Sequence, residues 1–157
     1  MEYLKFIGPT LLLIIGGIIT WLIQNRIEKL NKLREDLLSE RRDKYLKILE
    51  PTIKTLSQLG GGGTEKAIKQ IKSFDYKKTA FELNLYGSDD VVNSFNKYME
   101  YFYNRSGNNS NEETKSFLIV FGNLLLSIRK DLGNKKTKLK RKDMLRSFIS
   151  DVDNFLE

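Results

Sequence analysis

The sequence predicts an all-α protein with a single N-terminal transmembrane helix that extends into a bundle of about five helices. Three observations favour this class. An apolar run without a charged residue stands near the N-terminus of the 157-residue chain. Apolar residues recur at helical spacing through the rest of the chain, and no convincing alternation with a period of two competes with them. We therefore expect a transmembrane helix at 1–24, a stalk helix at 25–59 and a helical bundle at 64–157.

The apolar run extends from Phe6 to Ile23 and is long enough to cross a bilayer. At about 1.5 Å of rise per residue, a helix of this length covers about 27 Å, close to the thickness of the hydrocarbon core. Tyr3 lies near one end of the run and Trp21 near the other, where amphipathic rings prefer the membrane interface. These features predict a retained transmembrane helix.

A cleaved secretory signal and the core helix of a soluble protein are the alternatives. A signal would carry net positive charge before its apolar core, whereas Glu2 and Lys5 cancel, and no small-residue cleavage site follows Ile23. A core helix would normally be shorter and more evenly amphipathic. The retained span is therefore favoured over both alternatives.

The charges on the two flanks predict the orientation of the span. Lys5 and the amino terminus stand on one side, whereas a cluster of basic residues follows the other side. The positive-inside rule therefore places the large C-terminal part in the cytoplasm, and the absence of cysteine agrees with a reducing compartment. A composition rich in Lys, Ile and Asn suggests an AT-rich bacterial genome, so we expect a single-pass protein of the bacterial inner membrane. The basic residues of the second flank are Arg26, Lys29, Lys32, Arg34, Arg41, Arg42 and Lys44.

Small and weakly polar residues form a stripe within the span. Thr10, Gly17, Thr20 and Gln24 fall within about 80° of one another at 100° per residue. Such residues let membrane helices approach closely and hydrogen-bond, although Gly and Thr also occur in any single span. The stripe predicts a homo-oligomer in membrane lipid, and in a closed ring the same residues would line a pore.

The composition removes several kinds of site. The chain contains no cysteine and no histidine, which excludes a disulfide framework, a zinc finger, a cysteine nucleophile and a histidine base from this chain alone. The segment GGGGTEK keeps Thr64 and Lys66 in the wrong order for a phosphate-binding loop. We therefore expect no catalytic residue, no metal site and no cofactor.

The stalk is expected to continue directly from the span. The helical pattern runs from Gln24 without a break until Pro51, which either kinks the helix or begins a new one. The glycine run Gly60–Gly63 predicts a flexible loop, and Thr64 is expected to cap a short helix. Two apolar stripes follow the stalk, the first formed by Ile27, Leu30, Leu33 and Leu37, and the second by Leu46, Leu49, Ile53 and Leu56.

Two helices are expected next. The first runs from Tyr76 to Tyr86 and is ended by Gly87. The second opens with Asp89 and Asp90, since acids suit the positive end of a helix dipole. The aromatic run at 98–103 favours a place in the core over base stacking. The apolar residues of the two helices are Ala80, Phe81, Leu83, Leu85, Val91, Val92, Phe95, Tyr98, Met99, Phe102 and Tyr103.

The last part of the bundle follows a turn-rich loop at 105–111. A strongly apolar helix is expected from Glu112 to Gly133, and a final helix from about Arg141. The apolar residues of the first are Phe117, Leu118, Phe121, Leu124, Leu125, Ile128 and Leu132, and those of the second are Leu145, Phe148, Ile149, Val152 and Phe155.

The positive charge of the chain is concentrated in one segment. The whole chain has 27 Lys and Arg against 20 Asp and Glu, a net charge of +7. The segment Arg129–Arg146 holds nine basic and two acidic residues, which equals that excess. Such a segment attracts phosphate on RNA, DNA or anionic lipid, although charge runs are often solvated loops. The expected polyanion-binding residues are Lys130, Lys135, Lys136, Lys138, Lys140, Arg141 and Lys142.

One short pattern precedes this basic segment. Arg129 is followed by four residues and then by Asn134, at the end of the most apolar predicted helix. The pattern resembles the Arg-x4-6-His motif of the HEPN superfamily, in which two copies in a dimer form a composite RNA-cleaving site. Asn134 stands where that family has histidine, and an asparagine cannot transfer a proton near neutral pH. The resemblance implies a HEPN-like bundle, whereas the missing histidine argues against RNA cleavage. Asn134 can still hydrogen-bond a phosphate or ribose.

The whole layout is similar to the small membrane proteins encoded beside type VI CRISPR RNA-targeting nucleases. That resemblance implies ring-like oligomers that permeabilise the inner membrane during phage defence, with RNA or an RNA-guided nuclease as a possible partner. The expected function is a membrane-anchored, self-assembling, non-enzymatic defence effector that forms a pore. The alternatives are a membrane-tethered HEPN-like protein that binds or cleaves RNA, and a passive anchor for a soluble partner.

Overall fold

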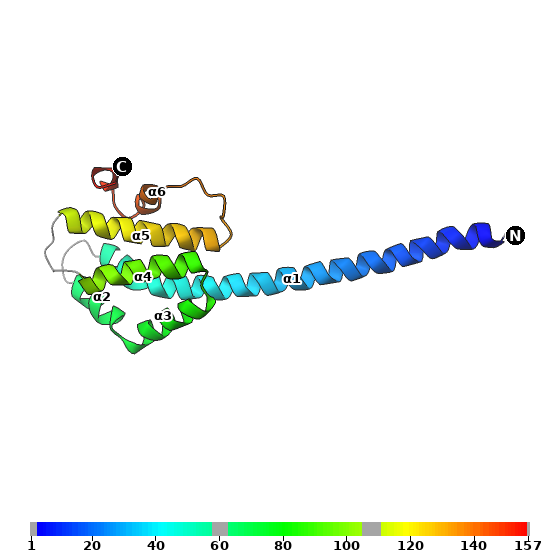
Figure 1. Ribbon diagram of the computed structural model, residues 1–157, viewed down its shortest axis with the longest axis horizontal. Helices are drawn as coiled ribbons and strands as arrows, with labels where there is room; N and C mark the ends of the chain where they lie inside the picture. The colour runs from blue at the N-terminus through cyan, green and yellow to red at the C-terminus, as the bar shows by residue number, and fades with distance from the viewer. Residues whose placement is uncertain (1–2, 58–62, 105–110, 157) are drawn as a thin grey trace. The chain divides into compact units, whose positions relative to one another are not determined.

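The computed structural model describes residues 3–57, 63–104 and 111–156, and these ranges form helices and turns without a strand (Figure 1). They belong to two compact units, Met1–Glu40 and Arg41–Glu157. The all-α class that the sequence predicts is confirmed. Across the described ranges there are six α-helices and one short 3-10 helix.

Helix α1, Tyr3–Ser57, is the longest element, and its first part forms the N-terminal unit. The large apolar side chains from Leu11 to Ile23 are 45–77 % exposed on every side of the helix. A helix that is apolar all round finds its stable environment in lipid or in a large core. Within the described ranges α1 is the one helix long and apolar enough to cross a membrane.

Helix α1 continues through Pro51 without a break, so the alternative that Pro51 begins a new helix is wrong. Proline removes one hydrogen bond of the helical ladder. Pro51 is fully buried, and its packing offsets that loss. The hydroxyl of Thr55 donates to the Pro51 carbonyl at 2.9 Å.

Helix α2, Gly63–Ile71, begins one residue before Thr64. A cap at Thr64 would place the first helical residue at 65, so this prediction is wrong by two positions, within the range over which helix ends shift. The predicted loop residues 60–62 lie outside the described ranges.

Helix α3, Phe74–Tyr86, begins two residues before the predicted start because Ser73 caps it. The Ser73 hydroxyl accepts a hydrogen bond from the Tyr76 N–H at 3.3 Å. At the other end, the N–H of Gly87 donates to the Leu83 carbonyl at 2.7 Å, so the predicted end of this helix is confirmed.

Helices α4, Asp89–Asn104, and α5, Asn111–Asp131, lie side by side at the centre of the C-terminal unit (Figure 1). The ring of Tyr98 is fully buried between them, 4.9 Å from the Phe102 ring and 5.9 Å from the Phe121 ring. The predicted core role of the aromatic run is confirmed for Tyr98 and Phe102, whereas Tyr103 is 74 % exposed.

The last predicted helix is wrong in length. Helix α6 covers only Arg141–Leu145, and after several turns a 3-10 helix, η1, covers Val152–Asn154. Ser, Asp, Asn and β-branched residues fill this stretch, and they favour turns over helix interiors because their side chains compete for backbone hydrogen bonds or lose rotamer freedom. Leu145 and Val152 are still fully buried.

Helix α6 approaches α5 closely at Gly122. A Cβ at this position would lie 3.1 Å from the Cβ of Arg141 and 3.3 Å from a methyl carbon of Leu145. The glycine therefore lets α6 pack against α5, and this contact places the start of α6 and its basic residues beside the longer helix.

Candidate functional site

The end of α5 is closed by a pair of backbone hydrogen bonds. The N–H of Gly133 donates to the Lys130 carbonyl, and the N–H of Asn134 donates to the Arg129 carbonyl, both at 3.2 Å. Gly133 has a φ of +108°, which suits a residue without a Cβ. This is a Schellman motif, in which the last carbonyls of a helix find donors in the residues that follow it.

Thr137 organises the segment after this motif. Its hydroxyl oxygen accepts hydrogen bonds from Arg129 Nε at 3.1 Å and from the Leu139 N–H at 3.3 Å. Its own N–H donates to the Asn134 carbonyl at 3.0 Å. The segment is therefore held in one conformation by side-chain and backbone bonds, although it contains no regular secondary structure.

The segment leads into α6 through a second capping contact. The Lys140 N–H donates to the Asp143 carboxylate at 2.7 Å, which satisfies one free donor at the start of the helix. Asp143, one of the two acidic residues of the basic segment, thus stabilises the start of α6.

Most of the predicted polyanion-binding residues point into solvent. None of the exposed ones forms an ion pair with an acidic side chain in the described ranges. Lys142 differs, since it is half-buried and lies 3.5 Å from Asp153, which also binds Arg146 at 2.9 Å. The guanidinium of Arg146 and the nearby Lys142 hold the pKa of the Asp153 carboxyl below its usual value. The exposed, unpaired residues, which we call the basic surface, are Lys130, Lys135, Lys136, Lys138, Lys140 and Arg141.

Asp131 joins the end of α5 to α1, and the sequence did not single it out. Its carboxylate is 8 % exposed and accepts from Arg41 Nη1 at 3.1 and 3.2 Å and from the Tyr45 hydroxyl at 2.5 Å. Burial and this carboxylate raise the pKa of Tyr45. An acid in the last turn of a helix interacts unfavourably with the helix dipole. This unfavourable position is the feature of the sequence that could have indicated a buried cationic or hydroxyl partner for Asp131.

The residues of the predicted oligomer face all lie on α1. The side chain of Thr10 is outside the described residues. No atom lies within 4 Å of a Cβ built on Gly17, and the Thr20 hydroxyl donates to the Gly16 carbonyl at 2.8 Å. Gln24 is exposed. The N-terminal unit thus leaves the described members of this stripe, Gly17, Thr20 and Gln24, uncovered.

A second uncovered stripe follows on the same helix. Its four members, Ile27, Leu30, Leu33 and Leu37, are 51–65 % exposed. We call these four residues the stalk stripe. They stand beyond the end of the apolar run, in a part of α1 that also carries many charges.

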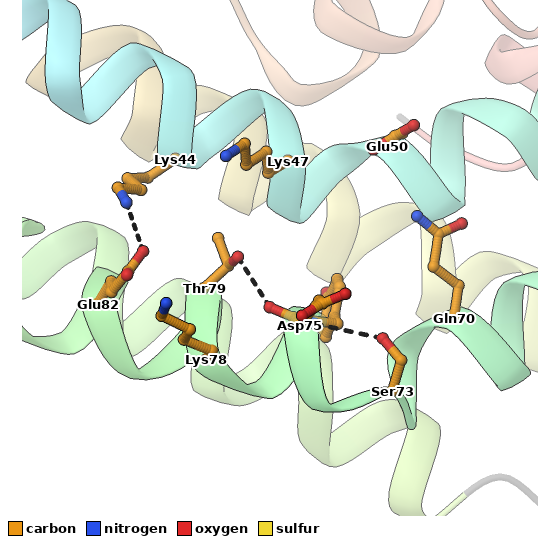
Figure 2. Close-up of a pocket in the computed structure, with 10 residues that line it drawn as sticks. Lys44, Lys47, Glu50, Gln70, Ser73, Asp75, Lys78, Thr79 and Glu82 are labelled. Carbon is orange, nitrogen blue, oxygen red and sulfur yellow. Dashed lines mark hydrogen bonds and ion pairs between the residues drawn. The ribbon is translucent and has the colours of Figure 1, made fainter.

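The C-terminal unit also contains a polar cleft of about 510 Å³, lined mainly by α1 and α3 (Figure 2). The Nζ of Lys44 on α1 is bound to the Glu82 carboxylate on α3. This cleft could not be predicted from the sequence, because its lining residues come from three helices. The cleft residues include Lys44, Lys47, Gln70, Asp75, Lys78 and Glu82.

Comparison with known proteins returns no match among protein-family models, characterised protein sequences or solved structures.

Proposed function

We propose that the chain is a self-assembling, non-enzymatic protein anchored in the bacterial inner membrane by the apolar part of α1. Copies associate through α1, and the assembly acts on the membrane as an oligomeric pore in antiviral defence. The length and exposed apolar surface of α1 support the anchor. The basic residues that follow the apolar run support a cytoplasmic location for Arg41–Glu157.

The stalk stripe is the observation that supports self-assembly most directly. Its spacings of three and four residues place Ile27, Leu30, Leu33 and Leu37 on one helix face. Each side chain is more than half exposed, and burying one large apolar side chain is worth about 1.5–3 kcal/mol. Copies anchored in one membrane have parallel α1 helices, which places their stalk stripes at the same height. The α1 helix of a second copy can therefore bury these exposed side chains.

The relation between the two stripes on α1 favours a ring over a symmetric dimer. At 100° per residue, the stalk stripe and the small-residue stripe formed by Thr10, Gly17, Thr20 and Gln24 are centred about 130° apart around the helix. A symmetric dimer uses one patch on both subunits and would leave one of the two stripes uncovered, whereas a ring gives each subunit two neighbours. Two faces at such an angle suit a subunit with a neighbour on either side.

The test is the particle mass of the full-length protein in detergent, measured by light scattering after gel filtration. A discrete assembly of six or more copies supports the ring, and ion conductance of reconstituted liposomes then tests the pore. A monomer or dimer at all concentrations contradicts the proposal. The defence role is supported by the resemblance to type VI CRISPR accessory proteins, and the measurement for it is phage plaque formation on cells with and without the protein.

The basic surface supports a second candidate function, the binding of RNA by the bundle. Thr137 and the Schellman motif order the segment, while six basic side chains remain exposed and unpaired within the described ranges. An ordered cluster of cations loses little entropy when it binds a phosphate backbone. Arg129 bonds to Thr137 in the same cluster, so it supports the surface rather than a proton-transfer step.

The RNA candidate requires salt-dependent binding by the full-length protein in neutral detergent. We expect affinity for a single-stranded RNA to fall steeply as salt rises, because each neutralised phosphate releases counterions. Binding that is absent at low salt contradicts this candidate. Binding to anionic vesicles but not to RNA instead identifies lipid headgroups as the polyanion.

A further inference from the structure

The cleft between α1 and α3 is lined by two exposed lysines, Lys47 and Lys78, that have no acidic partner within the described ranges. Lys47 on α1 and Lys78 on α3 both point into the space between the two helices (Figure 2). Two ammonium groups that line one cleft attract an anion into it.

Of the three described acids that line the same cleft, two are bound to other lysines, and the third, Asp75, lies away from the Glu82 end (Figure 2). Glu82 is bound to Lys44, and Glu50 is bound to Lys54 at 2.6 Å. The Lys44 bond, with the charges of Lys78 and Lys47, holds the pKa of the Glu82 carboxyl below its usual value. Three ammonium groups therefore act on one carboxylate, and the end of the cleft near Glu82 has excess positive charge.

The other end of the cleft carries hydrogen-bond acceptors. Gln70 of α2 and Asp75 of α3 line it together with Ser73 (Figure 2). The Thr79 hydroxyl donates to the Asp75 carbonyl at 2.9 Å and keeps a lone pair for a ligand donor. The cleft is thus cationic at one end and rich in acceptors at the other.

We propose that this cleft binds a small phosphate ester that carries free hydroxyl groups. The phosphate lies between Lys47 and Lys78, and the hydroxyl groups donate to Gln70, Asp75 and Thr79. Lysine suits this task because its ammonium group is a compact charge with three donors. The volume of about 510 Å³ lies within the usual range for small-molecule sites.

The experiment is calorimetric titration of the full-length protein in a neutral maltoside detergent, with ribose 5-phosphate, inorganic phosphate and free ribose as separate probes. We expect ribose 5-phosphate to bind more tightly than phosphate and ribose to give no binding. No heat with ribose 5-phosphate up to millimolar concentration would overturn the proposal. Equal affinities for ribose 5-phosphate and inorganic phosphate would overturn the role of the acceptor end.

Charge variants locate the site. The double variant Lys47→Gln/Lys78→Gln is expected to weaken ribose 5-phosphate binding by about tenfold or more, since both charge-assisted contacts to the phosphate are lost. The matched control Lys72→Gln/Lys77→Gln removes two exposed charges on neighbouring positions outside the cleft. It is expected to change affinity by less than about twofold. An equal loss in both variants would mean general attraction and would contradict the assignment.

Discussion

The backbone N–H of Asn134 donates to the carbonyl oxygen of Arg129 at 3.2 Å, so the two residues of the HEPN-like pattern are joined through the main chain. A separation of five positions is the separation that closes a Schellman motif. The Arg-x4-Asn pattern therefore has a structural explanation at the end of α5. The side chain of Asn134 is exposed and forms no hydrogen bond within the described ranges.

Gly133→Ala is expected to destabilise the C-terminal unit by about 1 kcal/mol, because Gly133 has a positive φ that an L side chain opposes. Steric crowding is excluded as the cause, since nothing lies within 4 Å of a Cβ at this position. Asn134→Ala keeps the backbone bond and is expected to cost less than about 0.5 kcal/mol. Urea unfolding of both variants checks the comparison, and a larger loss for Asn134→Ala would contradict this account of the pattern.

Asp131→Ala is expected to cost about 2–3 kcal/mol, because it leaves the buried Tyr45 hydroxyl and the Arg41 guanidinium without their acceptor. Tyr45→Phe should cost about 1 kcal/mol. In the double variant the two losses should not add, since both remove the same hydrogen bond. Additive losses in a double-mutant cycle would show that Asp131 and Tyr45 act independently.

The C-terminal unit is expected to lose stability in alkaline solution. Burial raises the pKa of Tyr45, Tyr76 and Tyr98 in the folded state, whereas a tyrosine in the unfolded chain ionises near pH 10. Above that pH the unfolded state loses protons that the folded state keeps, so unfolding becomes more favourable by up to about 1.4 kcal/mol per pH unit for each tyrosine. The measurement is urea unfolding between pH 8 and pH 11.5. A free energy of unfolding that stays constant above pH 10 would contradict this prediction.

Substitutions in the stalk stripe and in the small-residue stripe of α1 are each expected to reduce the particle mass. Leu30→Asn/Leu33→Asn places two polar side chains on the proposed contact face, and Gly17→Leu blocks close approach within the span. Both variants should shift the assembly toward smaller species while the circular dichroism of the bundle is retained. The matched control is Lys32→Gln/Glu35→Gln, which leaves the stripe and the net charge unchanged. An unchanged particle mass for both test variants would show that the two stripes are not part of the subunit interface.

Loss of basic side chains is expected to lower the salt dependence of RNA binding. Lys135→Gln/Lys136→Gln/Lys138→Gln removes three exposed charges of the basic surface. The slope of log K against log salt should become less steep by about 2, since each single-strand phosphate contact contributes about 0.7. The Lys72→Gln/Lys77→Gln control should leave the slope unchanged. Equal slopes for wild type and the triple variant would mean that RNA does not contact the basic surface.

The sequence was a good guide to the helices and a poorer guide to their buried faces. Helix α3 shows the difference, because it is apolar on two opposite sides. Tyr76 and Leu83 are buried, whereas Phe74, Phe81 and Leu85 are 63–79 % exposed. A periodicity with apolar residues on both sides cannot indicate which side faces the core, and only the position of α1 and the other helices decides it.

The sequence by itself determined that the chain is helical, that one helix is apolar enough to cross a membrane, and that the positive charge is concentrated near α6. Each of these properties depends on residues that are close together in the chain. The tertiary structure decided which distant groups meet. Asp131 reaches Arg41 and Tyr45, Lys47 and Lys78 share a cleft, and Gly122 admits α6. Those contacts depend on which helices pack together, and a periodic pattern in a single sequence shows that a helix has an apolar face but not which distant helix covers it.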